Sequence, residues 1–266
     1  MTEKKRVFVS VLATTVAMLV TTGCAGSSLS VGSLRTGSET VELGDASSVE
    51  VEIEMAAGNL EVVGGASDLL EADFTYNVAE LKPDVEYRND KLSVLTPDVE
   101  SINIGTLWDL DDYRYEWDLR LNDEVPMDMN ITLGAGTSDL DLGSLSLRTL
   151  DIDAGAGEIT LDLSGTTSLT RLSVDTGVGE ITIDLTGDWQ QDLDAAIRAG
   201  VGRLTILLPR DVGVRVDVEG GISDIDTRGL NRDGDDYVND AYGESEVTLR
   251  IEIDAGIGQI DLEVVD

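Results

Sequence analysis

The sequence predicts an all-β protein in which an N-terminal strand-rich region is followed by a β-solenoid of about six coils with a repeat of about 22 residues. Two observations lead to this prediction. Short turns centred on glycine recur along the second half of the chain, and each is followed by a segment in which apolar and polar residues alternate. Strand repeats of this period are typical of coils that stack on one another. The turns occupy residues 134–136, 155–157, 177–179, 200–202, 220–222 and 256–258.

Each coil is predicted to contribute two strands. Residues 158–163 (EITLDL) alternate with period two, and residues 172–175 (LSVD) alternate again after a polar turn. This alternation predicts apolar side chains inside the coil and polar side chains outside it. Because stacking aligns outward charges, we expect Arg198 and Arg203 to relieve repulsion between columns of acids. Stacking in chain order gives the columns Asp153, Asp175, Arg198, Glu219, Asp254 and Glu158, Glu180, Arg203, Asp224.

Residues 41–125 contain strand patterns but lack the repeat. Apolar residues alternate with polar ones in several short runs, which predicts half-buried strands. Asn89 and Asp90 separate two of these runs and predict a hairpin turn. The strand candidates are residues 49–55, 60–62, 70–76, 85–87 and 92–94.

Helix signals are almost absent from the chain. The best short candidate covers residues 189–196, and the repeat predicts that its second half is strand.

Four aromatic residues gather among acids shortly before the solenoid. Such a cluster could bind a cationic or sugar ligand, but we expect it to cap the apolar core at one end of the solenoid. These residues are Trp108, Tyr113, Tyr115 and Trp117.

Residues 1–23 are predicted to be a lipoprotein signal peptide. A basic stretch precedes a mostly apolar run over residues 7–20, which is too short for a comfortable membrane-spanning helix. The segment ends at a small residue before Cys24, the only cysteine in the chain, and this junction resembles the lipobox of lipoproteins. Lipidation of Cys24 would anchor the mature chain to the cell membrane or the outer membrane, on the extracytoplasmic side.

The remaining chain divides into three parts. Residues 24–40 are rich in Gly, Ser and Thr and are predicted to form a flexible tether. Residues 41–125 form the N-terminal region, and residues 126–266 form the solenoid. No further apolar run is long enough to predict a membrane span in the mature chain.

The chain is strongly acidic, with 53 Asp and Glu against 18 Lys and Arg and a formal net charge of −35. Nucleic acid is therefore a poor partner, and none is expected. The charge favours cationic ligands, divalent metals or basic peptides, although an acidic coat suited to high salt explains the same composition. The chain contains no histidine, which excludes Ser-His-Asp and Cys-His catalysis and the common His-based zinc sites.

Residues 231–240 (NRDGDDYVND) form the sharpest local motif. Oxygen-bearing side chains alternate in it, and Ca²⁺ prefers several carboxylate or carbonyl oxygens. Asn231, Asp233, Asp235 and Asn239 match early ligand positions of a calcium loop. The positions where such a loop requires Gly and a bidentate acid hold other residues. An acidic insertion between two coils explains the same sequence, so we predict no cofactor, with Ca²⁺ as the alternative.

Several segments together resemble the bacterial toast-rack domain over residues 48–266. The C-terminal half also resembles the C-terminal domain of LiaF-type proteins, which are membrane proteins tied to cell-wall-antibiotic responses. The chain differs from the LiaF type because it has a predicted lipid anchor instead of membrane helices. The segments that carry the toast-rack resemblance are residues 60–62, 81–87, 117–121, 125–129, 134–136, 140–142 and 237–243.

These observations predict a non-enzymatic lipoprotein that acts as a binding or scaffold module of the cell envelope. Its expected partners are the membrane, through the anchor, and an envelope protein or polymer. The resemblance to LiaF-type proteins implies a role in the envelope-stress response. Two alternatives stay open, a carboxylate-based glycan-cleaving enzyme on a β-helix and a calcium-stabilised adhesin.

Overall fold

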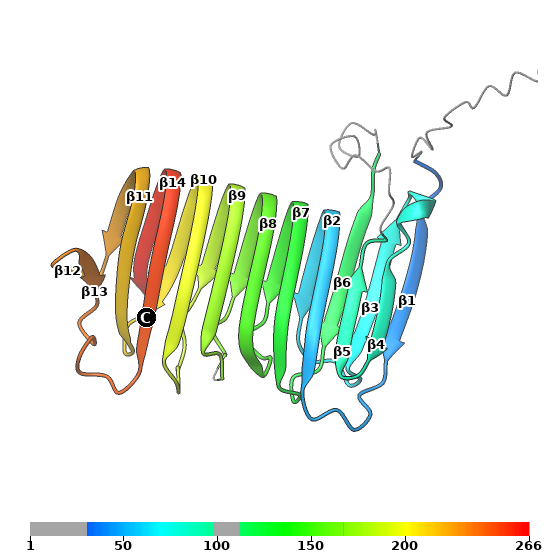
Figure 1. Cartoon of the computed structure of the whole chain (residues 1–266), viewed down its shortest axis with the longest axis horizontal. Coiled ribbons are helices and arrows are strands. Elements are labelled where there is room, and N and C mark those ends of the chain that lie inside the picture. Colours follow the sequence, from blue (N-terminus) through cyan, green and yellow to red (C-terminus); the bar gives the residue numbers. More distant parts are fainter. Residues whose placement is uncertain (1–30, 98–111, 167, 266) are drawn as a thin grey trace, which may run out of the picture.

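The computed structural model describes residues 31–97, 112–166 and 168–265. Its strands form one 14-stranded sheet, and one short 3-10 helix, η1, lies among the described residues (Figure 1). The all-β prediction is confirmed. The elements are β1 (Arg35–Val41), β2 (Val49–Val63), β3 (Leu70–Tyr76), η1 (Ala79–Leu81), β4 (Asp84–Arg88), β5 (Lys91–Leu95), β6 (Tyr115–Leu121), β7 (Met127–Asp141), β8 (Leu147–Asp162), β9 (Arg171–Asp184), β10 (Leu193–Pro209), β11 (Gly213–Arg228), β12 (Asn231–Asp233), β13 (Asp236–Val238) and β14 (Thr248–Val265).

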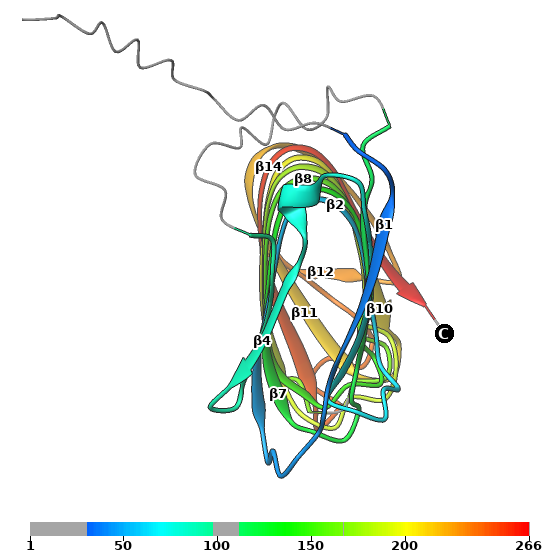
Figure 2. The same ribbon diagram turned by 90° about the vertical axis from the view of Figure 1, so that its right-hand side faces the viewer.

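Each coil of the solenoid is one long strand bent in the middle. The first limb of the strand runs up one wall, the chain bends at the glycine-centred turn, and the second limb runs down the opposite wall (Figure 2). The parallel ladder continues through the bend, where Gly157 pairs with Gly136 on one side and with Gly179 on the other. We call the row of aligned bends the arch. The coils follow one another in the order β2, β7, β8, β9, β10, β14 and β11.

Glycine is required at the bends by both conformation and space. Gly179 has φ of 153°, a conformation that L side chains rarely adopt. A Cβ atom at this position would lie 1.8 Å from the carbonyl oxygen of Gly157 in the neighbouring coil. The close approach of successive coils at the arch therefore depends on the missing side chain.

The apolar core lies between the two walls. Leu161, at 1% exposure, projects inward from the second limb of β8, while its neighbour Thr160 is exposed on the outside. The predicted inward residues are buried along the stack, except in β11, the last coil, where Val218 and Ile225 are only partly buried. The buried set includes Leu150, Ile152, Ile159, Leu172, Val174, Ile181, Ala195, Ile197, Leu204, Ile251, Ile253 and Ile260.

The coils do not stack in chain order. The last strand, β14, lies between β10 and β11 and is parallel to both. The predicted columns are therefore wrong in their order, because Asp254 lies between Arg198 and Glu219. In the column that runs from Glu158, Gln259 of β14 lies between Arg203 and Asp224. Strand β14 also forms an ion pair with each of its two neighbours. Arg203 of β10 is 3.1 Å from Asp261, and Arg228 of β11 is 3.1 Å from Glu263.

The stack begins earlier than the sequence analysis predicts. Strand β2 pairs with β7 along both limbs, and Gly58 lies opposite Gly136. The prediction that residues 41–125 lack the repeat is therefore wrong for β2. The repeat is hard to recognise there because the bend of β2 reads Ala-Ala-Gly, which does not match the Gly-x-Gly pattern. The division into domains stays a prediction, since one continuous sheet joins the two regions.

Beyond β2, separate short strands extend each wall. Strands β5 and β4 continue the first-limb wall, and β6, β3 and β1 continue the second-limb wall. Buried aromatic rings fill the space at this end: Trp117 lies 5.7 Å from Phe74 and 5.5 Å from Tyr115, measured between ring centroids. These rings close the core as expected of a cap, while Trp108 lies outside the described residues.

Two local predictions have clear outcomes. Asn89 and Asp90 form the β4–β5 hairpin turn, with φ of 50° and 61°. The candidate helix at 189–196 is wrong in its first half, where Trp189 is buried in a loop and its indole N–H donates to the carbonyl of Leu185 at 2.7 Å. The second half belongs to strand β10, as the repeat predicts.

Candidate functional site

The second-limb wall carries an acidic groove near the N-terminal end of the stack. The groove has a volume of about 350 Å³ and lies on the outer faces of β6, β2 and β7. Period-two alternation brings the acids to this face, since Glu116 and Asp118 flank the buried Trp117, and Asp139 precedes the buried Leu140. Its lining residues are Asn59, Leu60, Glu61, Glu116, Asp118, Thr137 and Asp139.

Four carboxylates form one row across this wall. Asp73 pairs in register with Asp118, Asp118 with Glu61, and Glu61 with Asp139. Neighbouring strands in a sheet are about 4.8 Å apart, and like charges opposite one another destabilise a sheet. The row therefore concentrates negative charge at a cost to stability.

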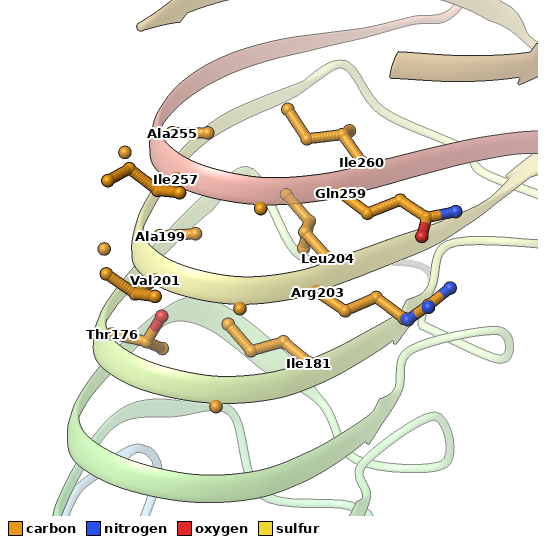
Figure 3. Close-up of a pocket in the computed structure, with 15 residues that line it drawn as sticks. Thr176, Ile181, Ala199, Val201, Arg203, Leu204, Ala255, Ile257, Gln259 and Ile260 are labelled. Carbon is orange, nitrogen blue, oxygen red and sulfur yellow. The ribbon is translucent and has the colours of Figure 1, made fainter. Parts of the chain in front are cut away.

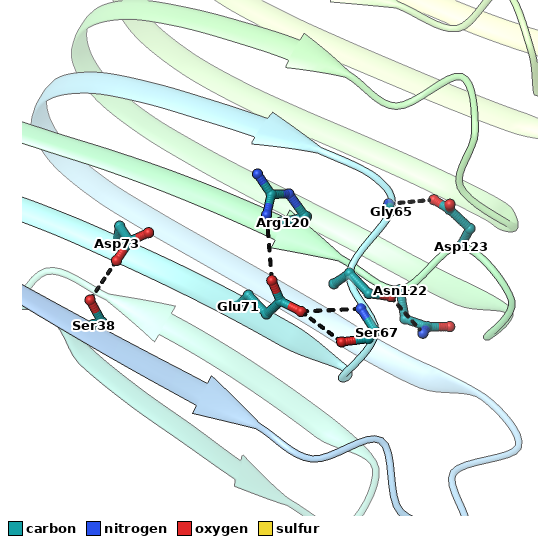
Figure 4. Close-up of polar contacts among 9 residues, drawn as sticks. Ser38, Gly65, Ser67, Glu71, Asp73, Arg120, Asn122 and Asp123 are labelled. Carbon is teal, nitrogen blue, oxygen red and sulfur yellow. Dashed lines mark hydrogen bonds and ion pairs between the residues drawn. The ribbon is translucent and has the colours of Figure 1, made fainter.

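Cations are engaged beside the row but not within it. Arg120 reaches Glu71 at 3.4 Å, and Asp73 accepts a hydrogen bond from Ser38 (Figure 4). Glu61, Asp118 and Asp139 form no ion pair with any residue that the structure describes. These three carboxylates are therefore available to a positively charged partner. We call them the groove acids.

The environment of Asp118 raises the pKa of its carboxyl group above the ordinary value. Partial desolvation is the largest cause, followed by the negative charges of Glu116 and Asp73. The ionised form of Asp118 is therefore less favourable in the folded chain than in the unfolded chain.

This shift predicts a pH dependence of stability. Because the folded-state pKa is raised, the penalty is complete above that pKa and disappears as the pH falls towards the ordinary Asp value of about 3.9. Asp118→Asn should therefore be more stable than the wild type at neutral pH, and the difference should shrink on acidification. Urea unfolding across a pH series measures it.

Asp192 provides a control of opposite sign. The N–H of Thr248 and the guanidinium of Arg250 lower the pKa of this carboxyl group. Asp192→Asn should therefore be less stable than the wild type at neutral pH, and this difference should also shrink in acid. A gap between Asp118→Asn and the wild type that is unchanged from neutral to acid pH would contradict the assignment of the penalty to ionised Asp118.

A second, smaller groove lies on the first-limb wall over β10, β14 and β11, with a volume of about 220 Å³. It combines one arginine with four acids. Arg198 lies 2.8 Å from Asp175 of the neighbouring coil, so part of its charge is already engaged, as expected of an arginine that relieves an acidic column. The acids are Asp217, Glu219, Glu252 and Asp254.

The four residues of the predicted calcium loop are divided between a hairpin and its exit. Asn231 and Asp233 lie on β12, Asp235 is in the turn, and Asn239 follows β13. The buried amide of Asn239 braces the backbone: its Nδ2 donates to the carbonyls of Pro209 and Val212, and its Oδ1 accepts the N–H of Val214.

Asp233 and Asp235, the two aspartates among the candidate calcium ligands, are exposed. Asn231 donates a hydrogen bond to Asp240 at 2.9 Å. Across residues 31–97, 112–166 and 168–265, no group of three or more Cys, Asp or Glu side chains is arranged to hold a metal ion. Calcium binding by this motif stays a prediction.

Salt should stabilise the protein through screening. At a net charge of −35, carboxylates on adjacent coils repel one another, and molar NaCl reduces the Debye length to about 3 Å. We expect NaCl to raise the melting temperature and millimolar Ca²⁺ to add little beyond its ionic strength. Thermal melts in NaCl, CaCl₂ and MgCl₂ at matched ionic strength test this.

The Asp233→Asn/Asp235→Asn variant separates the two explanations. A rise in melting temperature specific to Ca²⁺, and lost in this variant, would establish the hairpin as a calcium site, because a ligand that binds only the folded state stabilises it by mass action.

Cys24, the predicted lipidation site, lies outside the described residues. No helix in the described part of the chain is long and apolar enough to cross a membrane.

The fold agrees with a known family. A family model described as the N-terminal domain of toast_rack, DUF2154, matches residues 30–168 and 165–207. The chain belongs to this family. The toast-rack resemblance expected from the sequence is thereby confirmed, and it extends over both sides of the predicted boundary at residue 125. No curated protein matches the chain.

Solved structures resemble the chain to different degrees. A candidate cell adhesion protein from Clostridium sporogenes is 25% identical, with a TM-score of 0.66 over 88% of this chain and 100% of the other. Candidate adhesins from Bacteroides fragilis and Parabacteroides distasonis are each 11% identical with TM-scores of 0.33. The former match covers 86% of this chain and 97% of the other, and the latter 88% and 98%.

The acidic groove was missed in the sequence analysis. Its acids come from β6 and β7, which are consecutive in the chain, and from the distant strand β2, which lies between them. The β2–β6 pairing is parallel and non-local. The available signal is the alternation of acids on the outer face of each separate strand, which predicts exposure but not proximity.

Proposed function

We propose that this toast-rack protein is a non-enzymatic binding or scaffold module of the cell envelope, held at the extracytoplasmic surface through Cys24. The structural likeness to a candidate cell adhesion protein, at a TM-score of 0.66, supports a role in binding. The predicted signal peptide and the junction at Cys24 support the location.

The acidic groove is the proposed binding face, and the unneutralised groove acids are the observation that carries this proposal. The three groove acids lie on adjacent strands, where like charges repel, and none of them forms an ion pair within the part of the chain that the structure describes. Arg114 is engaged at the edge of the groove by Glu116, at 3.0 Å. Natural proteins tolerate such local conflicts mainly at functional sites. A segment rich in Lys or Arg, on an envelope protein or a cationic polymer, would relieve the repulsion on binding.

Electrostatic complementarity of this kind chiefly raises the association rate and the specificity, so binding should weaken as salt increases. The resemblance of the C-terminal half to LiaF-type domains extends the proposal: binding at the groove would report the state of the envelope during stress.

The test uses the Glu61→Gln/Asp118→Asn/Asp139→Asn variant. It should lose most of its affinity for a short oligolysine probe and should no longer capture the envelope component retained by the wild-type chain in a pull-down. Its folded state should be at least as stable as the wild type, because the repulsion has been removed.

A matched control removes the same charge elsewhere on the surface. Asp151, Asp153 and Glu180 are exposed outward residues of β8 and β9. None of them lines the groove or pairs in register with a residue that does. The Asp151→Asn/Asp153→Asn/Glu180→Gln variant should keep specific capture. Equal losses in the two variants would show that net charge, and not the groove, attracts the probe, and would overturn the groove as binding face.

The anchor has its own test. Cys24→Ser should abolish metabolic labelling with fatty acid and release the protein from the membrane fraction. Persistent labelling of this variant would refute attachment through Cys24 but would leave the groove proposal intact.

A glycan-cleaving enzyme is the second candidate. The observation that favours it is the raised pKa of Asp118 beside Glu61, since glycosidases pair a protonated carboxyl group with an ionised one. Turnover of a glycan panel that disappears in both Asp118→Asn and Glu61→Gln would replace the binding proposal with this one.

A further inference from the structure

A ladder of exposed apolar side chains runs along the outside of the arch over three neighbouring coils. Val178, Val201 and Ile257 occupy the centres of the bends of β9, β10 and β14 and pair in register. Their exposed fractions are 57%, 48% and 58%, and Figure 3 shows the last two on the outer side of the bends. We call these residues the arch ladder. The equivalent residues nearer the N-terminal end are Ala57, Ala135 and Ala156.

The charge beside the arch ladder is more balanced than on the rest of the chain. In β8 and β9 the outward residues on both sides of the bend are acids. In β10 both positions are arginines, Arg198 and Arg203, and in β14 one of them is Gln259. Arg198 is paired with Asp175, and Arg203 with Asp261, so the two arginines neutralise acids beside the strip. A strip of exposed apolar groups with neutralised flanks, on an otherwise acidic protein, is suited to a lipid surface of low charge.

The chain enters the fold at the level of the arch. Arg35, the first residue of β1, pairs with Tyr76, and Tyr76 pairs with Tyr115. Tyr115 adjoins the first bend, because a Cβ atom on Gly58 would lie 2.2 Å from its carbonyl oxygen. Just before β1, the N–H of Gly32 donates to the carbonyl of Asn77 at 2.7 Å. Figure 1 shows β1 starting at the end of the walls where the coils bend.

This entry point sets which face an anchored chain turns to the membrane. The segment from Cys24 to Val31 spans at most about 25 Å when fully extended. The loops at the other ends of the walls lie about 25 Å farther along the strands, since each limb contains about eight residues. The arch is therefore the side of the fold nearest to the anchor.

We propose that the arch ladder docks on the surface of a lipid bilayer of low charge, so that the solenoid lies along the membrane with its arch against it. The choice of a bilayer as the occupant rests on the proposed anchoring through Cys24. The lipid anchor would attach the N-terminal half of the solenoid, where the bends carry alanine, to the bilayer. The arch ladder would attach the other half. The acidic walls then remain accessible from the side.

The experiment places a fluorescent probe on the arch. The full chain with Val201→Cys, purified with its lipid and labelled with an environment-sensitive dye, is reconstituted into phosphatidylcholine vesicles. Its emission should shift to the blue, and lipid-borne quenchers should quench it. Gln191→Cys is the matched control, because Gln191 is exposed in the loop at the other end of the same coil. Its dye should remain accessible to aqueous iodide.

A second variant checks that the ladder itself makes the contact. Adding Val178→Ser and Ile257→Ser to the probe at position 201 should abolish the blue shift, while the melting temperature stays close to that of the parent because both side chains are exposed. A blue shift that persists in this variant, or identical quenching at positions 201 and 191, would overturn the proposal. So would a shift that depends on the protein-to-lipid ratio, which would indicate contact between copies.

The mass of the N-terminal peptide separates failure of the ladder from failure of the anchor. Lipidated Cys24 with a water-exposed probe at position 201 would refute docking alone. If Cys24 is unmodified, its thiol would also take the dye, so the probe is then placed on the Cys24→Ser/Val201→Cys chain. A lipid-exposed probe on that chain would refute the anchor and retain the docking surface.

Discussion

Gly179→Ala should strongly destabilise the solenoid. The new Cβ atom would lie 1.8 Å from the carbonyl oxygen of Gly157, and alanine would have to adopt a φ of 153°. The contact is with backbone inside a parallel ladder, so relief requires the separation of two coils. We expect a loss of about 4 kcal/mol or more, as is found for severe strain, which lowers the melting temperature by about 10 °C in a chain of this size.

Gly37→Ala is the matched control. Gly37 lies on the edge strand β1, and a Cβ atom there would meet nothing within 4 Å. Circular dichroism melts of both variants should leave Gly37→Ala within about 1 kcal/mol of the wild type. Equal melting temperatures for Gly179→Ala and Gly37→Ala would contradict the close approach of neighbouring coils at the arch.

Leu161→Asp should prevent folding. Leu161 is 1% exposed between the two walls, where a carboxylate would lose its hydration without gaining a partner. Leu161 pairs with Leu140 on one side and with Ile183 on the other, so its immediate neighbours are also apolar. We expect aggregated or protease-sensitive protein, because an isolated buried charge costs several kcal/mol.

Thr160→Asp introduces the same charge one residue earlier, on the outer face. Thr160 lies beside Asp139 in the ladder, so some repulsion is added, but water screens it and the cost should be below about 1 kcal/mol. Leu161→Asn separates the effect of charge from that of the lost apolar contacts. A soluble monomer of Leu161→Asp with a cooperative melt close to that of Thr160→Asp would contradict the inward orientation of Leu161.

The sequence predicts the outward orientation of the acids in the candidate site but not their proximity to one another. Alternation around Trp117 and before Leu140 predicts that Asp118 and Asp139 face outward, and both do. Their proximity through Glu61 depends on β2 lying between β6 and β7. Parallel pairing between distant segments leaves no local pattern in the sequence, because each strand alternates in the same way whichever neighbour it has.

The N-terminal coil shows a similar limit. The run from Val49 to Met55, the turn and the return were all visible as strands, yet the coil was not recognised because its bend starts with two alanines. Ala57 is acceptable there because it occupies the central position of the bend, while the strained φ of 153° falls on Gly58. A single glycine therefore suffices for the conformation of this bend.

The all-β class, the inward and outward faces of each strand and the register in which coils align can all be predicted from the sequence. These follow from local chemistry: alternation sets the faces, and the glycine of each bend fixes which residues align. The order in which the coils lie beside one another is known only from the folded structure. The chain after β11 makes a hairpin, is braced by Asn239 and returns to place β14 between β10 and β11. The register of β14 is the same beside any coil, so its position depends on contacts between distant segments, including the ion pairs Arg203–Asp261 and Arg228–Glu263.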